Sequence, residues 1–251
     1  MIFFIAVMIA VTVATAFWLA RRSGNDESVV LEVIPDRPCA FGCDMAWLAV
    51  RNADPEELIE QLGLFEPTLC NWDSGIGAVY DDRLSVTHVF VSPPVKGWTF
   101  VVGLPLPHPM GPGFVDKSTP FLLELGRRFK EVQYFFTYPT IDLYAWARVK
   151  DKRLLRAFAV TDEGIVWNRG RASKEERGLG LKLFELRGVE GREGDAGGEM
   201  ILLPTEDHVL QLARSWSLDP TTLGPQSASP GLGWLTIAPA GWRSERIRRI
   251  A

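Results

Sequence analysis

The sequence predicts an α+β protein in which an N-terminal transmembrane helix precedes a mainly antiparallel-sheet domain with a few short helices. Three observations indicate this class. The first twenty residues are almost entirely apolar, extended runs bounded by turn residues dominate the middle of the chain, and only a few short segments show helical spacing. With 251 residues, 47% of them hydrophobic, the chain can form one sizeable core or two small ones.

The apolar segment 2–20 contains no charged side chain. As a helix it would extend about 28 Å, close to the thickness of a hydrocarbon core. Trp18 stands where an indole can lie among headgroups, and Arg21 and Arg22 follow, as is typical of a cytoplasmic flank. We therefore expect residues 1–22 to anchor the chain in a bacterial inner membrane, with the domain in the cytoplasm.

A periplasmic domain is the alternative, reached through a reversed anchor or a cleaved signal peptide. Residues 14–16, Ala-Thr-Ala, have the small-x-small form of a cleavage site. Against cleavage, no basic residue precedes the apolar run, and the run is longer than is usual in signal peptides.

The next segments lead into the domain. Residues 23–38 are expected to form a tether and a first strand, and residues 39–223 the α+β domain. A strand over 45–51 is followed by a helix over 55–62, for which Asp54 is the N-cap and Pro55 the first helical residue. The first half of the domain is then expected to continue as an antiparallel meander with strands at 75–80, 85–92 and 98–103.

The proline-rich stretch 104–117 is expected to be a surface loop or a seam between two halves. After it, Ser118 opens a second helix. A second meander follows, with strands at 132–138, 142–150, 154–161 and 165–168. Each meander comes after a short helix, which leaves a structural duplication open, although no residue-level repeat supports it.

Two more helices and a tail complete the predicted order. Ser173 and Glu176 form a capping-box pair for a short helix, and Thr205 caps a helix that ends near residue 215. Residues 224–251 read as a loose basic tail. Its candidate membrane contacts are Trp242, Arg243, Arg246, Arg248 and Arg249, which could rest on an anionic leaflet.

Motifs for chemistry are scarce. His88, His108 and His208 lie far apart without ligand spacing, so no metal site is expected, and no glycine-rich phosphate loop indicates a nucleotide cofactor. We expect His88 to be satisfied within a strand and His108 to be exposed. Around Ser74, Trp72 stands where a nucleophile elbow needs its first glycine, which argues against a hydrolase.

The net charge and the cysteines limit the class of partner and the compartment that we expect. The net charge of −4 argues against nucleic acid, which favours a basic excess. Cys39, Cys43 and Cys70 are an odd number without zinc spacing, and we expect reduced thiols in a cytosolic domain. If the domain is exported, a Cys39–Cys43 or Cys43–Cys70 disulfide is the alternative.

Four strings carry a resemblance to a known group. They are residues 42–50 (GCDMAWLAV), 129–135 (FKEVQYF), 144–148 (YAWAR) and 216–220 (WSLDP). Over about residues 40–223 the chain resembles an uncharacterised group of bacterial proteins. The resemblance implies a bacterial origin and a single compact unit, and it brings no catalytic residue with it.

These features favour a membrane-anchored, non-catalytic protein-binding module, with an immunity protein that neutralises a toxin as one concrete candidate. Besides the bilayer along residues 2–20, we expect a protein partner that contacts Trp72, Asp73 and Trp98. Two alternatives remain: an enzyme of unknown class using loop residues 71–74, and an envelope assembly factor.

Overall fold

The computed structural model describes residues 29–109, 116–162, 164–181 and 203–242. Residues 1–30 and 31–251 form separate units, and the account below concerns the second unit by itself. Within the described residues, no helix is both long and apolar enough to cross a bilayer. The predicted anchor, including Trp18, Arg21 and Arg22, lies outside the described residues.

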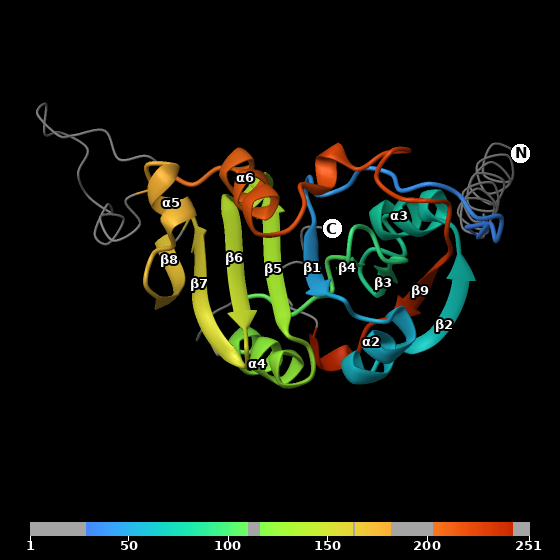
Figure 1. Cartoon of the computed structure of the whole chain (residues 1–251), viewed down its shortest axis with the longest axis horizontal. Coiled ribbons are helices and arrows are strands. Elements are labelled where there is room, and N and C mark those ends of the chain that lie inside the picture. Colours follow the sequence, from blue (N-terminus) through green and yellow to red (C-terminus); the bar gives the residue numbers. More distant parts are fainter. Residues whose placement is uncertain (1–28, 110–115, 163, 182–202, 243–251) are drawn as a thin grey trace, which may run out of the picture. The chain divides into compact units, whose positions relative to one another are not determined.

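One antiparallel sheet organises the domain (Figure 1). Its strands are β1 (Ala46–Arg51), β2 (Phe65–Cys70), β3 (His88–Val91), β4 (Trp98–Val102), β5 (Glu131–Tyr138), β6 (Leu143–Lys150), β7 (Arg153–Thr161), β8 (Gly164–Gly170) and β9 (Gly233–Ile237). Their order across the sheet is β2-β9-β3-β4-β1-β5-β6-β7-β8. The α-helices are α2 (Pro55–Leu62), α3 (Trp72–Tyr80), α4 (Ser118–Arg128), α5 (Lys174–Gly178) and α6 (Glu206–Trp216). The α+β class and the mainly antiparallel sheet are confirmed.

The second predicted meander is confirmed, because β5 to β8 follow one another across the sheet as they do in sequence. The strand β5 also pairs with β1, with Trp47 opposite Phe135 and Leu48 opposite Tyr134. These central side chains are fully buried. The strands on either side of the proline-rich stretch are therefore hydrogen-bonded into the same sheet.

The first predicted meander is wrong in its first strand, because residues 75–80 belong to the helix α3. Its other two strands are present as β3 and β4, which pair antiparallel. Asn71 caps this helix by accepting a hydrogen bond from the Ser74 amide at 2.9 Å. The Asp36 carboxylate accepts the Trp72 and Asp73 amides at 2.6 and 2.9 Å, which satisfies two more donors of the first turn. Gly75 lets the helix approach the sheet, since a Cβ there would lie 2.2 Å from the Phe90 ring.

Two strands were not predicted, and one of them lies in the expected tail. β9 is inserted between β2 and β3, and its Leu235 and Thr236 are buried. The expectation that residues 224–251 are loose is thus wrong for the described part, which continues to Trp242. In the N-terminal segment of the domain a first strand was expected. There Asp36 forms an isolated bridge with Gly231 instead of a strand.

Helices cover both faces of the sheet. On one face Trp72 of α3 packs against Phe90, with ring centroids 5.4 Å apart, and Trp216 of α6 packs against Phe135 at 5.8 Å. On the opposite face α4 lies so close that a Cβ on Gly126 would be 2.3 Å from a methyl group of Val149. The pleat explains this division, because successive strand residues point to opposite faces.

The stretch from Leu104 to residue 109 is buried, so the expected surface loop is wrong for these residues. Leu106 is fully buried, and the His108 ring lies 5.3 Å from the ring of Phe136. Prolines cannot extend the sheet, but their apolar rings can fill the space beside α4. His108 is therefore a core residue and not the exposed one that was expected. Residues 110–115 lie outside the described part.

Candidate protein-binding rim

The residues predicted to contact a partner do not form an exposed surface. Trp72 is fully buried and Trp98 is 5% exposed, so neither ring can reach a partner in this conformation. Both fill the core because their strand and helix faces point inward, and the Arg51 guanidinium lies over the Trp98 ring at 5.1 Å. Asp73 is exposed, and its amide donates to the Asp36 carboxylate at 2.9 Å.

Of the expected membrane contacts in the tail, only Trp242 is described. It is half-buried, and its ring lies 5.1 Å from that of Phe121 on α4. This intramolecular contact occupies part of the indole that was expected to rest on the bilayer. Arg243, Arg246, Arg248 and Arg249 lie outside the described residues.

A different surface brings carboxylates and tyrosines together at the end of the sheet where β1 and β6 begin and β5 ends. We call it the acidic rim and define it by the following residues, which come from four segments of the chain. They are Asp44, Tyr80, Tyr138, Asp142, Tyr144, Glu206 and Asp207. Asp44, Asp142 and Asp207 are exposed, and the tyrosines are partly exposed. In the described parts of the chain no Lys or Arg forms an ion pair with any of these carboxylates.

Tyr80 fixes the segment that carries Asp44. Its hydroxyl donates to the Cys43 carbonyl at 2.8 Å and accepts from the Gly42 amide at 3.2 Å. Thr137 of β5 holds the same segment, because its hydroxyl donates to the Gly42 carbonyl at 2.8 Å. Asp44 adopts a left-handed conformation with φ of 49° directly before β1. The rim is therefore built on hydrogen-bonded backbone and not on a free loop.

The β5–β6 connection and α6 supply the rest of the rim. Tyr144 stands opposite Thr137 across the β5–β6 ladder, and Asp142 ends the short turn between these strands. Glu206 and Asp207 occupy the first turn of α6, where negative charge is stabilised by the helix N-terminus. Thr205 and His208 cap that turn, with the Thr205 amide donating to Nδ1 of His208 at 3.1 Å.

Like charges lie close together across the rim. Burial and the charge of Glu206 raise the pKa of Asp44 above its usual value. Burial, followed by the charges of Asp142, Glu206 and Asp44, raises the pKa of Tyr144. Burial, with neighbouring charges adding to it, raises the pKa of Tyr80 to about 12. A cationic group placed on this rim would relieve the repulsion among its carboxylates.

The rim is poorly suited to nucleophilic catalysis. Burial and the charge of Glu206 raise the pKa of the Cys43 thiol, so the reactive thiolate is disfavoured at neutral pH. At the alternative site, residues 71–74, the Ser74 hydroxyl has a structural role, because it accepts a hydrogen bond from the Glu32 amide at 3.0 Å. All three cysteines are free thiols. Within the described ranges no group of three His, Cys, Asp or Glu side chains could hold a metal ion.

Comparison with known proteins assigns no family or function to the chain. No protein-family model, curated protein or solved structure matches the chain.

Sequence reasoning missed the rim because its members are separated by up to 163 positions, from Asp44 to Asp207. The sequence signal for the rim is limited to residues that are close together in the chain. Tyr138, Asp142 and Tyr144 surround one predicted strand connection, and Glu206 and Asp207 follow a predicted cap. Placing Asp44 and Tyr80 beside them required the β1–β5 pairing and the α3 helix, neither of which was predicted.

Proposed function

We propose that the chain is a membrane-anchored, non-catalytic protein-binding module of the immunity type, and that the acidic rim binds a basic surface of its partner. The observation that carries this proposal is the convergence of four carboxylates and three partly exposed tyrosines, with no ion pair from these carboxylates to a Lys or Arg among the described residues. Tyrosine supplies large contact area at small entropic cost, and carboxylates speed association with a cationic patch. Inhibition would follow from occlusion of the partner's site.

The proposed membrane anchor would hold the module close to the bilayer. The apolar run 2–20 and the following Arg21 and Arg22 favour an anchor in a bacterial inner membrane, with the domain in the cytoplasm. A partner acting at the inner leaflet would then meet the rim at a raised local concentration, since tethering turns a bimolecular encounter into a local one.

The test is growth rescue in a bacterial host. Each gene next to the one encoding this chain is expressed under induction, alone and together with the full chain. We expect one neighbouring product to arrest growth and the full chain to restore it. The double variant Asp44→Lys with Glu206→Lys should weaken binding of that product on the order of 100-fold, because like charges then face each other.

The matched control reverses two exposed carboxylates away from the rim, Glu60→Lys on α2 with Glu66→Lys on β2. This variant keeps the same net charge as the rim variant and should still restore growth. Circular dichroism of both purified variants separates loss of binding from loss of folding. Full protection by a folded rim variant would contradict the proposal that the rim is the binding surface.

A further inference from the structure

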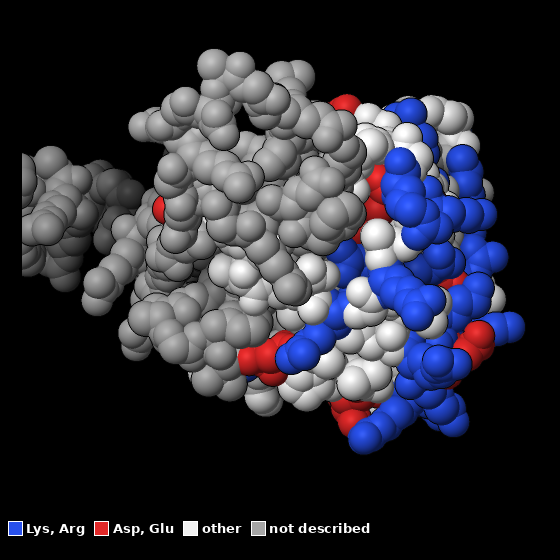
Figure 2. Space-filling view, turned by 90° about the vertical axis from the view of Figure 1, so that its left-hand side faces the viewer, with Lys and Arg blue, Asp and Glu red and all other residues white. Residues whose placement is uncertain are grey.

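The described surface has a second charged region, of opposite sign to the rim. Figure 2, which looks onto the side of the molecule where β8 lies, shows Lys and Arg gathered over one part of the surface with few Asp or Glu among them. We define the basic end by the following residues. They are Lys130, Lys150, Lys152, Arg153 and Arg171, flanked by Arg127 and Arg128 in the last turn of α4.

The strand register places these residues together at one end of the sheet. Lys150 pairs with Arg153 in the β6–β7 hairpin, and the Asp151 amide donates to the Lys130 carbonyl at 2.9 Å. Arg171 follows Gly170, which is paired with Arg156 on the neighbouring strand. The basic end is therefore one continuous surface contributed by the residue before β5, the β6–β7 hairpin and the segment after β8.

Most of this positive charge is not neutralised locally. Glu131 pairs with Arg148 at 2.7 Å and with Lys150 at 3.5 Å. Lys130, Lys152, Arg153 and Arg171 are exposed, and none of the four forms an ion pair within the described part of the chain. These four side chains can therefore bind an external anion without breaking an existing pair.

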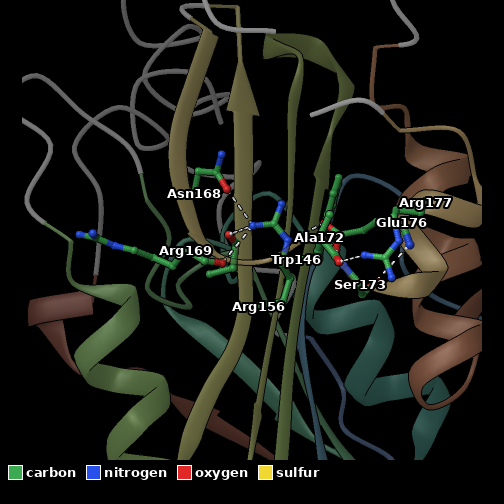
Figure 3. Close-up of polar contacts among 9 residues, drawn as sticks. Trp146, Arg156, Asn168, Arg169, Ala172, Ser173, Glu176 and Arg177 are labelled. Carbon is green, nitrogen blue, oxygen red and sulfur yellow. Dashed lines mark hydrogen bonds and ion pairs between the residues drawn. The ribbon is translucent and has the colours of Figure 1, made fainter. Parts of the chain in front are cut away.

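A buried network holds the segment that carries Arg171 (Figure 3). Arg156 of β7 donates to Oε1 of Glu176 at 2.7 Å and, through Nη1, to the Arg169 carbonyl at 3.0 Å. Glu176 in turn accepts the Ser173 amide in the capping box of α5. Residues on both sides of Arg171 are thus fixed to the sheet, so the backbone that carries this cation is positioned before any ligand arrives.

The basic end lies opposite the acidic rim along the same strands. Tyr144 stands near the start of β6 and Lys150 at its last position, so about 20 Å of strand separates the two regions. A ligand at the basic end therefore leaves the rim uncovered. When the basic end docks on a surface, the acidic rim therefore faces away from that surface.

We propose that the basic end docks on anionic lipid headgroups of the membrane to which the chain is tethered. This inference rests on the proposed anchor. Residues 21–31, fully extended, reach at most about 36 Å, so the domain stays within reach of the bilayer surface. The rim then points away from the membrane toward its partner.

Among the described residues at this end no aromatic ring is exposed, which favours a lipid surface over a macromolecule. In the described strands beside it, the Trp146 and Phe158 rings are fully buried and Trp167 is 2% exposed. Single-stranded nucleic acid and protein partners are usually held by exposed aromatic side chains. Headgroup binding needs charge alone, with each basic residue near the surface strengthening attachment about fivefold.

The experiment uses the full chain on vesicles of phosphatidylcholine, with or without phosphatidylglycerol. Flotation after an alkaline carbonate wash tests the anchor, because it retains inserted proteins and removes peripheral ones. Amine labelling read by mass spectrometry then tests docking. We expect Lys130 and Lys152 to be protected on the anionic vesicles only, with protection lost at high salt. Lys96, in the turn between β3 and β4, should be labelled equally on both.

Neutralising two unpaired cations gives the second measurement. Lys152→Gln with Arg153→Gln should lower the ratio of docked to undocked domain about 25-fold. The matched variant Arg83→Gln with Lys96→Gln, which loses the same charge elsewhere, should leave it unchanged. Carbonate-resistant flotation with equal labelling on both vesicles would overturn docking and keep the anchor, whereas loss of flotation would overturn the anchor. Protection of Lys130 and Lys152 by RNA or polyglutamate but not by vesicles would also overturn lipid docking.

Discussion

The two ring nitrogens of His108 have different surroundings. Nδ1 lies 2.9 Å from the Leu106 carbonyl and donates to it, whereas Nε2 is buried without a hydrogen-bond partner among the described residues. Burial lowers the pKa of His108 from 6.5 to about 4. A proton on Nε2 would place an unsatisfied charged donor next to the Phe136 ring.

This environment predicts a pH-dependent stability. Because the folded-state pKa of His108 lies below the unfolded value, the unfolded chain takes up the proton first as the pH falls. The stability that neutral His108 supports is complete above pH 6.5 and is lost toward pH 4. Between pH 7 and pH 5 the free energy of unfolding should drop by about 2 kcal/mol more in the wild type than in His108→Asn. Urea unfolding at both pH values measures the difference, and parallel pH profiles would contradict it.

At the scale of elements, prediction succeeded where local signals decide the structure. The helix α2 begins after Asp54, whose side chain accepts the Glu56 and Glu57 amides, and it ends at Gly63 in the left-handed conformation. The α5 capping box of Ser173 and Glu176 is also present as expected. Caps and turn residues act over three or four positions, so one sequence is enough to find them.

Elements defined by distant contacts were missed. The α3 helix contains two glycines and only a short apolar run, so its sequence carries a weak helical signal. Its first turn is also held by Asp36, which lies 36 residues before Trp72 in the sequence. β9 becomes a strand by inserting between β2 and β3, which are contributed by the opposite end of the domain. Such pairings depend on tertiary context that local propensity does not contain.

The α5 helix provides an element-scale prediction. Arg156 and Glu176 are 3% and 0% exposed, and Glu176 also accepts the Trp146 indole at 2.8 Å. Glu176→Leu alone should cost about 3–5 kcal/mol of unfolding free energy, because it leaves a buried guanidinium unpaired. The double variant with Arg156→Leu should cost clearly less than the sum of the single variants, since it buries no lone charge.

Urea unfolding of the four chains in this double-mutant cycle measures the coupling. The control is Lys174→Leu on the same short helix, whose side chain is 85% exposed and whose ion pair with Glu175 is 3.8 Å long. It should change stability by no more than about 0.5 kcal/mol. Additive effects of Arg156→Leu and Glu176→Leu would show that the pair does not bind α5 to the sheet.

For the whole molecule, the side of the membrane on which the domain lies decides which compartment the acidic rim and the basic end face. Arg21 and Arg22 predict a cytoplasmic domain, because basic residues beside an apolar span are retained on the inner side. The free thiols of Cys39, Cys43 and Cys70 are compatible with a reducing compartment.

Fusions of green fluorescent protein and of alkaline phosphatase to the C-terminus test this orientation in a bacterial host. We expect fluorescence without phosphatase activity, and we expect Arg21→Glu with Arg22→Glu to shift part of the population to the opposite result, because the retained positive charge is lost. Arg127→Glu with Arg128→Glu reverses the same charge far from the apolar span and should leave the orientation unchanged. Phosphatase activity in the wild-type fusion would place both the acidic rim and the basic end in the periplasm. The partner would then have to be sought there, and the lipid surface facing the basic end would be the outer leaflet.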